Sequence, residues 1–186
     1  MRLFVAVNPP ARAMQELVDA VQPLRALPGA DRLRWTEPAG WHLTLAFLGE
    51  VPADEVAALE RELARLASTH PVHRLRLAGA GTFGERALWA GVEGDVQALR
   101  RLAADVRAAL DATDEERGFH PHLTLARAAT TRGRGPDGPG GLRALAAPLR
   151  DFRGTPWTAA RIQLMRSETG YGPARYTVVE GWPLGA

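Results

Sequence analysis

The sequence predicts an α+β fold, in which helices and antiparallel strand pairs alternate along one chain of 186 residues. Two observations predict it. Stripes of apolar residues at helical spacing alternate with short apolar runs typical of strands, and glycines and prolines separate the two kinds of segment. The hydrophobic content of 46% is sufficient for a core without disulfides. We therefore expect residues 1–186 to fold as one domain.

The expected elements follow in chain order. A buried strand over residues 3–7 precedes a helix over 9–27, short strands over 33–36 and 42–48, and a helix with the apolar stripe Val56, Leu59, Leu63 and Leu66. Strand-like runs over 73–78 and 86–92 predict a hairpin, and a helix over 95–110 follows it with Asp95 as an acidic N-cap. The remaining strands are expected over 122–127, 159–165 and 175–179. Residues 130–141 contain five glycines and two prolines without periodicity, which predicts a flexible loop.

The composition excludes several kinds of chemistry. All 23 basic residues are arginine, and cysteine is absent. Without lysine there is no covalent lysyl nucleophile of the ATP-dependent ligase type, no Walker-type phosphate lysine and no Schiff base. Without cysteine there is no disulfide, thiolate nucleophile or cysteine metal site. The pI of 9.9 accompanies a formal charge of only +2, so composition alone does not argue for nucleic-acid binding.

The N-terminal apolar run, residues 3–7, is too short for a signal peptide or a membrane span and stops at Asn8. We expect a cytoplasmic protein that does not interact with membranes.

A pentapeptide repeat is the strongest signal in the sequence. The segment HLTLA starts at His42 and again at His122, and a chance second copy has odds of roughly one in a thousand. On a strand, residues two positions apart share a face, so His42 lies beside Thr44 and His122 beside Thr124, while the leucines point the other way. A duplicated lobe would bring two imidazoles and two hydroxyls to one point.

Two imidazoles around one phosphate would supply a general base and a general acid, because imidazole titrates near neutral pH. The two threonine hydroxyls would donate to the non-bridging oxygens. This set suits phosphoryl transfer without a metal, although the sequence does not say which histidine is the acid.

The chain resembles the two-histidine phosphoesterase superfamily, and within it the RNA 2′,3′-cyclic phosphodiesterases, also called 2′-5′ RNA ligases. The resemblance covers nearly the whole chain, apart from the segment after Thr130. It includes both HxTx motifs and the segments RLFVAV, HLTLAFLGEV, ALWAGV, FHPHLTLAR and RYT. It implies a bilobal fold with pseudo-twofold symmetry, each lobe an antiparallel sheet backed by helices, and an active groove between the sheets.

The resemblance also implies roles for individual residues. His42 would protonate the leaving 3′-oxygen and His122 would accept the proton of the attacking water, which leaves a 2′-phosphate. Thr44 and Thr124 would hold the phosphate. Arg127 and Phe47 would bind substrate. Apart from the resemblance, Tyr171 and Tyr176 flank the last turn, one of them is expected to reach the groove, and Tyr176 is the candidate for substrate binding. The implied partners are RNA molecules with 2′,3′-cyclic phosphate ends, tRNA fragments among them. No cofactor and no metal are implied, the protein is expected to be a monomer, and 2′-5′ ligation would be the reverse reaction.

Other interpretations stay open from the sequence. His120 and His122 form an HxH pair that would suit a metal, but no further ligand has suitable spacing. His70 and His73 flank Pro71 at a helix end and are expected to face solvent or to cap the helix. The alternative functions are a phosphodiesterase acting on another small cyclic phosphate and a non-catalytic module that binds RNA ends.

Overall fold

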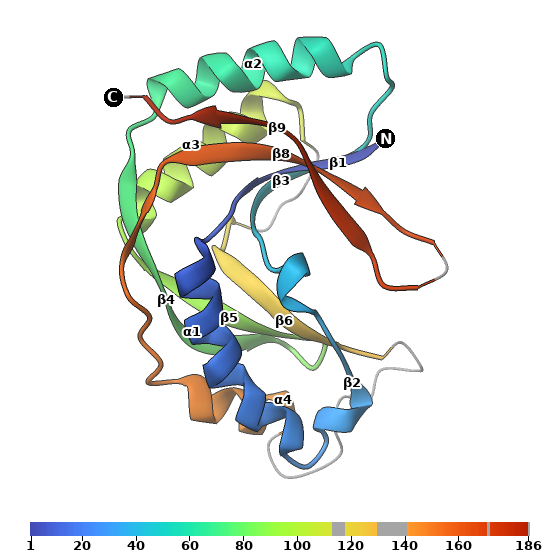
Figure 1. Ribbon diagram of the computed structural model, residues 1–186, viewed down its shortest axis with the longest axis vertical. Coiled ribbons are helices and arrows are strands. Elements are labelled where there is room, and N and C mark those ends of the chain that lie inside the picture. The colour runs from blue at the N-terminus through green and yellow to red at the C-terminus, as the bar shows by residue number, and fades with distance from the viewer. Residues whose placement is uncertain (113–117, 130–140, 171, 186) are drawn as a thin grey trace.

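The computed structural model describes residues 1–112, 118–129, 141–170 and 172–185, and it contains two antiparallel sheets (Figure 1). Sheet A has the strand order β3-β1-β8-β9, formed by Leu43–Glu50, Arg2–Val7, Arg161–Glu168 and Arg175–Pro183. Sheet B has the order β2-β6-β5-β4-β7, formed by Leu33–Trp35, His122–Ala128, Ala87–Gly94, His73–Phe83 and Trp157–Ala159. The expected α+β class with two helix-backed antiparallel sheets is therefore confirmed.

The helices pack on one side of each sheet and enclose a common core. Helix α2 (Val56–Thr69) contacts β8 and β9, whereas α1 (Ala11–Val21) and α4 (Gly141–Ala146) contact sheet B. Helix α3 (Val96–Ala109) contacts β3 of sheet A and β4 of sheet B, so it links the two. One cluster of buried side chains takes members from both sheets and all four helices, among them Leu17, Leu45, Leu63, Leu102, Leu125 and Leu145. The opposite faces of the sheets carry the candidate site.

Three elements differ from what the sequence predicted, two in their bounds and one in its N-cap, for identifiable reasons. Helix α1 ends at Val21 and continues as a 3₁₀ turn over Gln22–Ala26, because Pro23 has no backbone N–H to donate. Strand β4 runs through Gly79, whose φ of 65° permits an irregularity in the pairing with β5. Asp95 does precede α3, but it makes no side-chain cap, and its Oδ2 instead accepts a hydrogen bond from the N–H of Arg74 at 3.0 Å.

The sequence did not predict α4 or β7, each of which is short. The loop expected over residues 130–141 lies outside the described residues, except that Gly141 begins α4.

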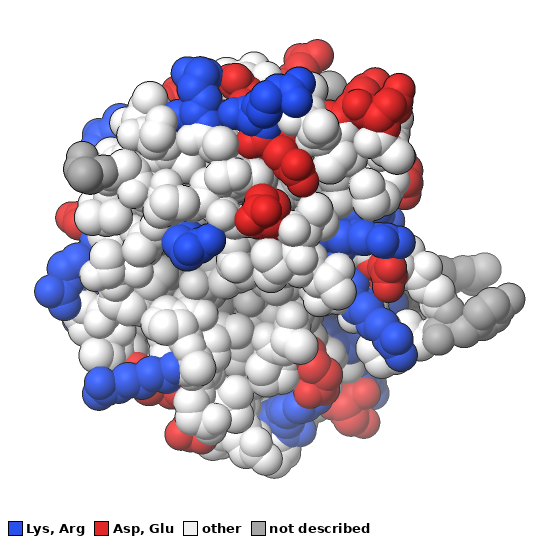
Figure 2. Space-filling model, turned by 45° about the horizontal axis from the view of Figure 1, so that its top comes forward, with Lys and Arg blue, Asp and Glu red and all other residues white. Residues whose placement is uncertain are grey.

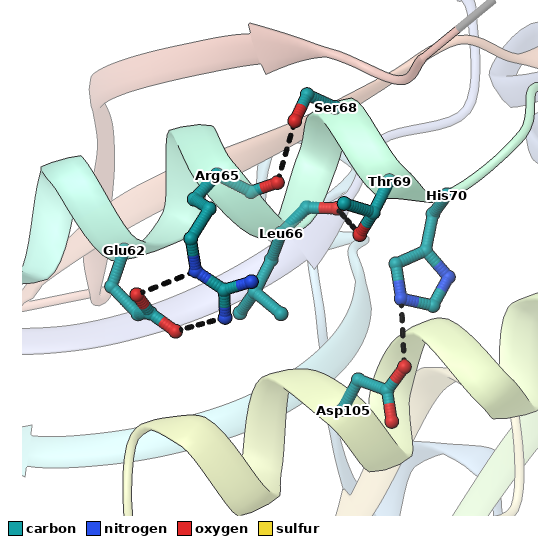
Figure 3. Close-up of polar contacts among 7 residues, drawn as sticks. All are labelled: Glu62, Arg65, Leu66, Ser68, Thr69, His70 and Asp105. Carbon is teal, nitrogen blue, oxygen red and sulfur yellow. Dashed lines mark hydrogen bonds and ion pairs between the residues drawn. The ribbon is translucent and has the colours of Figure 1, made fainter.

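The end of α2 is fixed by side chains, as Figure 3 shows. The hydroxyls of Ser68 and Thr69 donate to backbone carbonyls one turn earlier, at 2.7 and 2.8 Å. His70 Nε2 lies 2.9 Å from Asp105 Oδ2 on α3. His70 and His73 are only 9% and 5% exposed, so neither faces solvent, but His70 is the C-cap residue of α2, as the alternative expectation had it. The C-terminal segment packs beside His70, with Gly185 N–H donating to the carbonyl of His70 at 2.9 Å, and His73 Nδ1 lies 3.0 Å from the carbonyl of Pro71.

On one face of the molecule, charge is dispersed rather than concentrated. On the face drawn in Figure 2, arginines and carboxylates intermingle without a broad patch of one sign. In the described residues no helix is long and apolar enough to cross a membrane.

Candidate active site

The two HLTLA segments occupy equivalent places in the two sheets. His42 immediately precedes β3, and His122 is the first residue of β6. Burial repeats residue by residue: both histidines and both threonines are half-buried, and the leucines and alanines of both copies are buried. In each copy the leucines join the common core, so the His and Thr side chains project from the opposite side of the sheet. We call these surfaces the histidine faces of sheets A and B.

Both copies also contain a β-bulge at the same position. In β3 the pairing with β1 passes from Ala46 directly to Thr44, and in β6 the pairing with β5 passes from Ala126 directly to Thr124. The extra residue is Leu45 in one copy and Leu125 in the other. A bulge reverses the side-chain alternation beyond it, so Phe47 and Arg127 turn onto the histidine faces instead of the core.

Each bulge is held by a hydrogen bond to the carbonyl of its leucine. Arg107 Nε of α3 donates to Leu45 O at 3.0 Å, and Thr36 N–H donates to Leu125 O at 2.8 Å. The guanidinium of Arg107 also lies 5.4 Å above the ring of Phe119, in the segment that leads to His122. Arg107 thus contacts the chain around both motifs, a role that no sequence pattern indicated.

His42 is fixed by the amide of Asn8, the residue after β1. His42 Nδ1 lies 2.9 Å from Asn8 Oδ1, which accepts the Nδ1 proton. The amide nitrogen of Asn8 in turn donates to Gln163 Oε1. His42 Nε2 is shielded from solvent and has no hydrogen-bond partner among the described residues, so its hydrogen-bonding capacity is unused. Burial lowers the pKa of His42 to about 4, so the free imidazole is neutral at pH 7.

Aromatic rings surround His42. Tyr176 on β9 and Phe4 on β1 lie with their ring centroids 5.0 and 5.4 Å from the imidazole. Phe47 is 6.0 Å from Phe4 and 55% exposed, which leaves its ring free to stack on another group. The ring of Tyr176 packs over Gly40, where an added Cβ would approach it to 3.1 Å.

His122 is oriented by the backbone carbonyl of His120, two residues earlier. Its Nδ1 donates to the carbonyl of His120 at 2.6 Å, and in the described residues no group bonds to Nε2. Burial is the main cause that lowers the pKa of His122. The hydrogen bond to the carbonyl of His120 raises this pKa, and the charges of His120 and Arg127 lower it further. Arg127 follows the bulge at Leu125, which turns it onto the same face as His122.

A second aromatic cluster surrounds His122, and sequence reasoning assigned it no role. Phe83 on β4 lies 4.8 Å from the imidazole, and the ring of Trp89 on β5 lies 4.7 Å from that of His120. Trp89 can pack flat on β4 because the facing residue is Gly81, where a Cβ would come within 2.4 Å of the indole. The sequence signal was the glycine opposite an aromatic residue within a hairpin.

The two motif strands, β3 and β6, contact each other where the sheets meet. The structure therefore brings His42, Phe4, Phe47 and Tyr176 together on one histidine face, and His122 and Arg127 on the other. Thr44 and Thr124 share these faces by register. Within the part of the chain that the structure describes, no three His, Cys, Asp or Glu side chains form a group that could hold a metal ion.

Two antiparallel sheets, each presenting one histidine beside one threonine, define the two-histidine phosphoesterase fold. The family model of the 2′-5′ RNA ligase superfamily matches residues 9–170, and the chain belongs to that superfamily.

Similar proteins agree with this assignment. The chain is 35% identical over 156 residues to an RNA 2′,3′-cyclic phosphodiesterase of Geobacillus stearothermophilus, covering 81% of the chain but only about half, 47%, of that protein. It is 32% identical over 201 residues to an RNA 2′,3′-cyclic phosphodiesterase of Thermus thermophilus, covering 99% of the chain and 90% of the relative.

Solved structures give the same result. A crystal structure of a Thermus thermophilus protein superposes with a TM-score of 0.77 at 31% identity, covering 99% of this chain and 98% of that one. The Escherichia coli LigT complex with 3′-AMP superposes with a TM-score of 0.71 at 28% identity, covering 100% and 98%.

Proposed function

We propose that this protein is a hydrolase that opens RNA 2′,3′-cyclic phosphate ends to 2′-phosphates, by acid–base catalysis with His42 and His122 and without a metal. One observation supports this most strongly. Two half-buried imidazoles stand at equivalent places of a duplicated strand, each with Nδ1 occupied by a carbonyl oxygen and with Nε2 unpaired among the described residues. The names of the similar proteins supply the substrate class.

In the proposed reaction, water attacks phosphorus and gives a proton to His122 Nε2, while the bond from phosphorus to the 3′-oxygen breaks. The departing 3′-oxygen takes a proton from His42 Nε2. The lowered pKa of His122 leaves it neutral and ready to accept a proton. His42 must carry a proton, and a cyclic phosphate anion beside Nε2 would raise its pKa from about 4.

Thr44 and Thr124 would donate hydrogen bonds to the non-bridging oxygens, and Arg127 would add a charged donor beside His122. Phe47 and Tyr176, which flank Phe4 on the face of His42, would contact the terminal base or ribose. If an RNA 5′-hydroxyl replaced water as the nucleophile, it would give its proton to His122 and bond to phosphorus while the 3′-oxygen leaves with a proton from His42. The same groups in the same roles would thus form a 2′-5′ linkage without ATP.

The test uses an RNA oligomer ending in 2′,3′-cyclic phosphate, incubated with the protein in EDTA and without ATP. Comparison of the product with synthetic 2′- and 3′-phosphate standards should identify a 2′-phosphate end. His42→Ala and His122→Ala should each slow turnover by about 10²–10⁴-fold. Arg61→Gln, an exposed change on α2 behind sheet A, is the matched control and should leave the rate unchanged.

A 3′-phosphate product would reverse the two roles, and loss of activity in EDTA with recovery in zinc would contradict the metal-free reaction. Binding of the RNA end without turnover would instead favour the non-catalytic module.

A further inference from the structure

A pair of arginines lies side by side on the histidine face of sheet B. In the pairing of β2 with β6, Arg34 stands directly opposite Arg127. Directly opposed residues of antiparallel strands point to the same face, with Cβ atoms about 5 Å apart. Arg127 is turned onto the histidine face by the bulge at Leu125, so Arg34 projects from that face too. Trp35 and Leu33, its neighbours in β2, pack against the core, which agrees with this alternation.

Arg34 and Arg127 are both exposed residues, and neither forms an ion pair with another described residue. Two acidic residues are near β2 along the chain. Asp31 precedes the strand and forms no ion pair with Arg34, and Glu37 follows it and is paired with Arg25 at 3.2 Å. Like charges directly opposite each other in a sheet are unfavourable, so the pair has no stabilising role in the absence of an anion. Arg32, also close in sequence, lies outside the pairing of β2 with β6.

The spacing suits a second phosphate. Because the bulge adds one residue, Thr124 and Arg127 are separated by the length of two ordinary strand residues, about 7 Å along the strand. Arg34 lies on the neighbouring strand, about 5 Å from Arg127. In an RNA chain that ends in a cyclic phosphate, the next phosphate toward the 5′ end is the phosphodiester on the 5′-oxygen of the same nucleotide. Two planar forks side by side match the non-bridging oxygens of such a group.

We propose that Arg34, together with Arg127, forms a binding site for the phosphodiester 5′ to the terminal nucleotide. The inference rests on the proposed function of the histidine pair and deepens it. The preferred substrate is an RNA chain with at least one internal phosphate, and not a nucleoside 2′,3′-cyclic phosphate.

The experiment compares two substrates, adenosine 2′,3′-cyclic phosphate and the dinucleotide ApA ending in 2′,3′-cyclic phosphate. The wild-type protein, Arg34→Gln, Arg34→Lys and the control Arg61→Gln are each tested. Arg34→Gln should lower kcat/KM for the dinucleotide about tenfold or more, the worth of one hydrogen bond to a charged group. Turnover of the nucleoside substrate should change less than about twofold, because that substrate has no phosphodiester for Arg34 to bind. Arg34→Lys should recover part of the loss, and Arg61→Gln should match the wild type.

Salt gives a second measure of the same contact. Loss of one phosphate contact should reduce the slope of log KM against log salt concentration for the dinucleotide by about 0.7, because fewer counterions are released. Equal losses on both substrates, or no loss on either, would overturn the assignment of Arg34.

A binding arm separates this inference from the proposed chemistry. The dissociation constants of ApA 2′-phosphate and adenosine 2′-phosphate are measured for the same variants. If the protein turns over neither substrate but Arg34→Gln still weakens only the dinucleotide product, the phosphodiester site stands and the catalytic proposal fails. Unchanged binding of the dinucleotide by Arg34→Gln would contradict the site whatever the activity.

Discussion

Asn8→Asp is the substitution that examines the environment of His42 most closely. The change replaces the amide oxygen that accepts from Nδ1, at 2.9 Å, by a carboxylate oxygen with nearly the same shape. Two unit charges about 4 Å apart interact by about 4 kcal/mol at an effective dielectric constant of about 20, equivalent to about three pKa units. Partial burial of the new carboxylate costs some of this, so the pKa of His42 should rise by about one to two pH units from about 4.

The consequence for catalysis has a definite sign. A general acid must be protonated, and above its pKa the active fraction falls about tenfold for each pH unit. The falling alkaline limb of kcat/KM should therefore move to higher pH by about one to two units in Asn8→Asp. The matched control Asn8→Ala, which removes the acceptor without adding charge, should reduce the rate but should not move this limb upward.

The assays are the pH dependence of kcat/KM for a nucleoside 2′,3′-cyclic phosphate and an NMR titration of the His42 ring. Gln163 can turn its amide over to donate to the new carboxylate, so the variant is expected to remain folded. An unchanged ring titration in Asn8→Asp would refute the contact between Asn8 and His42. A shifted titration with an unchanged alkaline limb would refute the role of His42 as the acid.

Three further predictions concern the rest of the site. In the wild-type protein the pKa values of both histidines are lowered below 6.5, so the pH profile of kcat/KM should be bell-shaped with both limbs below pH 6.5. The alkaline limb of kcat should lie at higher pH, because bound phosphate favours protonated His42. Arg107→Met removes the donor to the carbonyl of Leu45 and should lower kcat, and it should also lower the free energy of unfolding by about 1–3 kcal/mol. Arg107→Lys should restore part of kcat, and the exposed change Arg101→Met on the same helix should lower neither quantity. Gly40→Ala places a Cβ 2.9 Å from Thr36 Cγ2 and 3.1 Å from the Tyr176 ring. It should raise KM through Tyr176 and lower kcat through Thr36, whose N–H holds the bulge beside His122, while its neighbour change Ala39→Ser should have no effect.

Much of the site could be predicted from the sequence because it lies in a repeated segment. The HLTLA repeat carries its own strand period, so His42 with Thr44, and His122 with Thr124, were placed on common faces without any tertiary information. The leucines of the repeat indicated the core side in the same way. The long helices α2 and α3 also show their apolar stripes in the sequence.

What the sequence did not show depends on tertiary contacts. Strict alternation would have turned Phe47 and Arg127 toward the core, and only the bulges at Leu45 and Leu125 reverse them. Asn8 and Arg107 reach the site from distant parts of the chain, so local pattern cannot reveal them. Helix α4 is short and lies next to a glycine-rich segment, where periodicity has too few residues to be visible.

The central claim is that His42 and His122 act as one catalytic unit on one phosphate, and a double-mutant cycle tests it most directly. Turnover of the dinucleotide ending in 2′,3′-cyclic phosphate is measured for His42→Ala, His122→Ala and the double variant. Groups that act together lose their effect together, so the double variant should be little slower than either single variant. Single losses of about 10²-fold or more that multiply in the double variant, or near-normal activity in either single variant, would contradict the account.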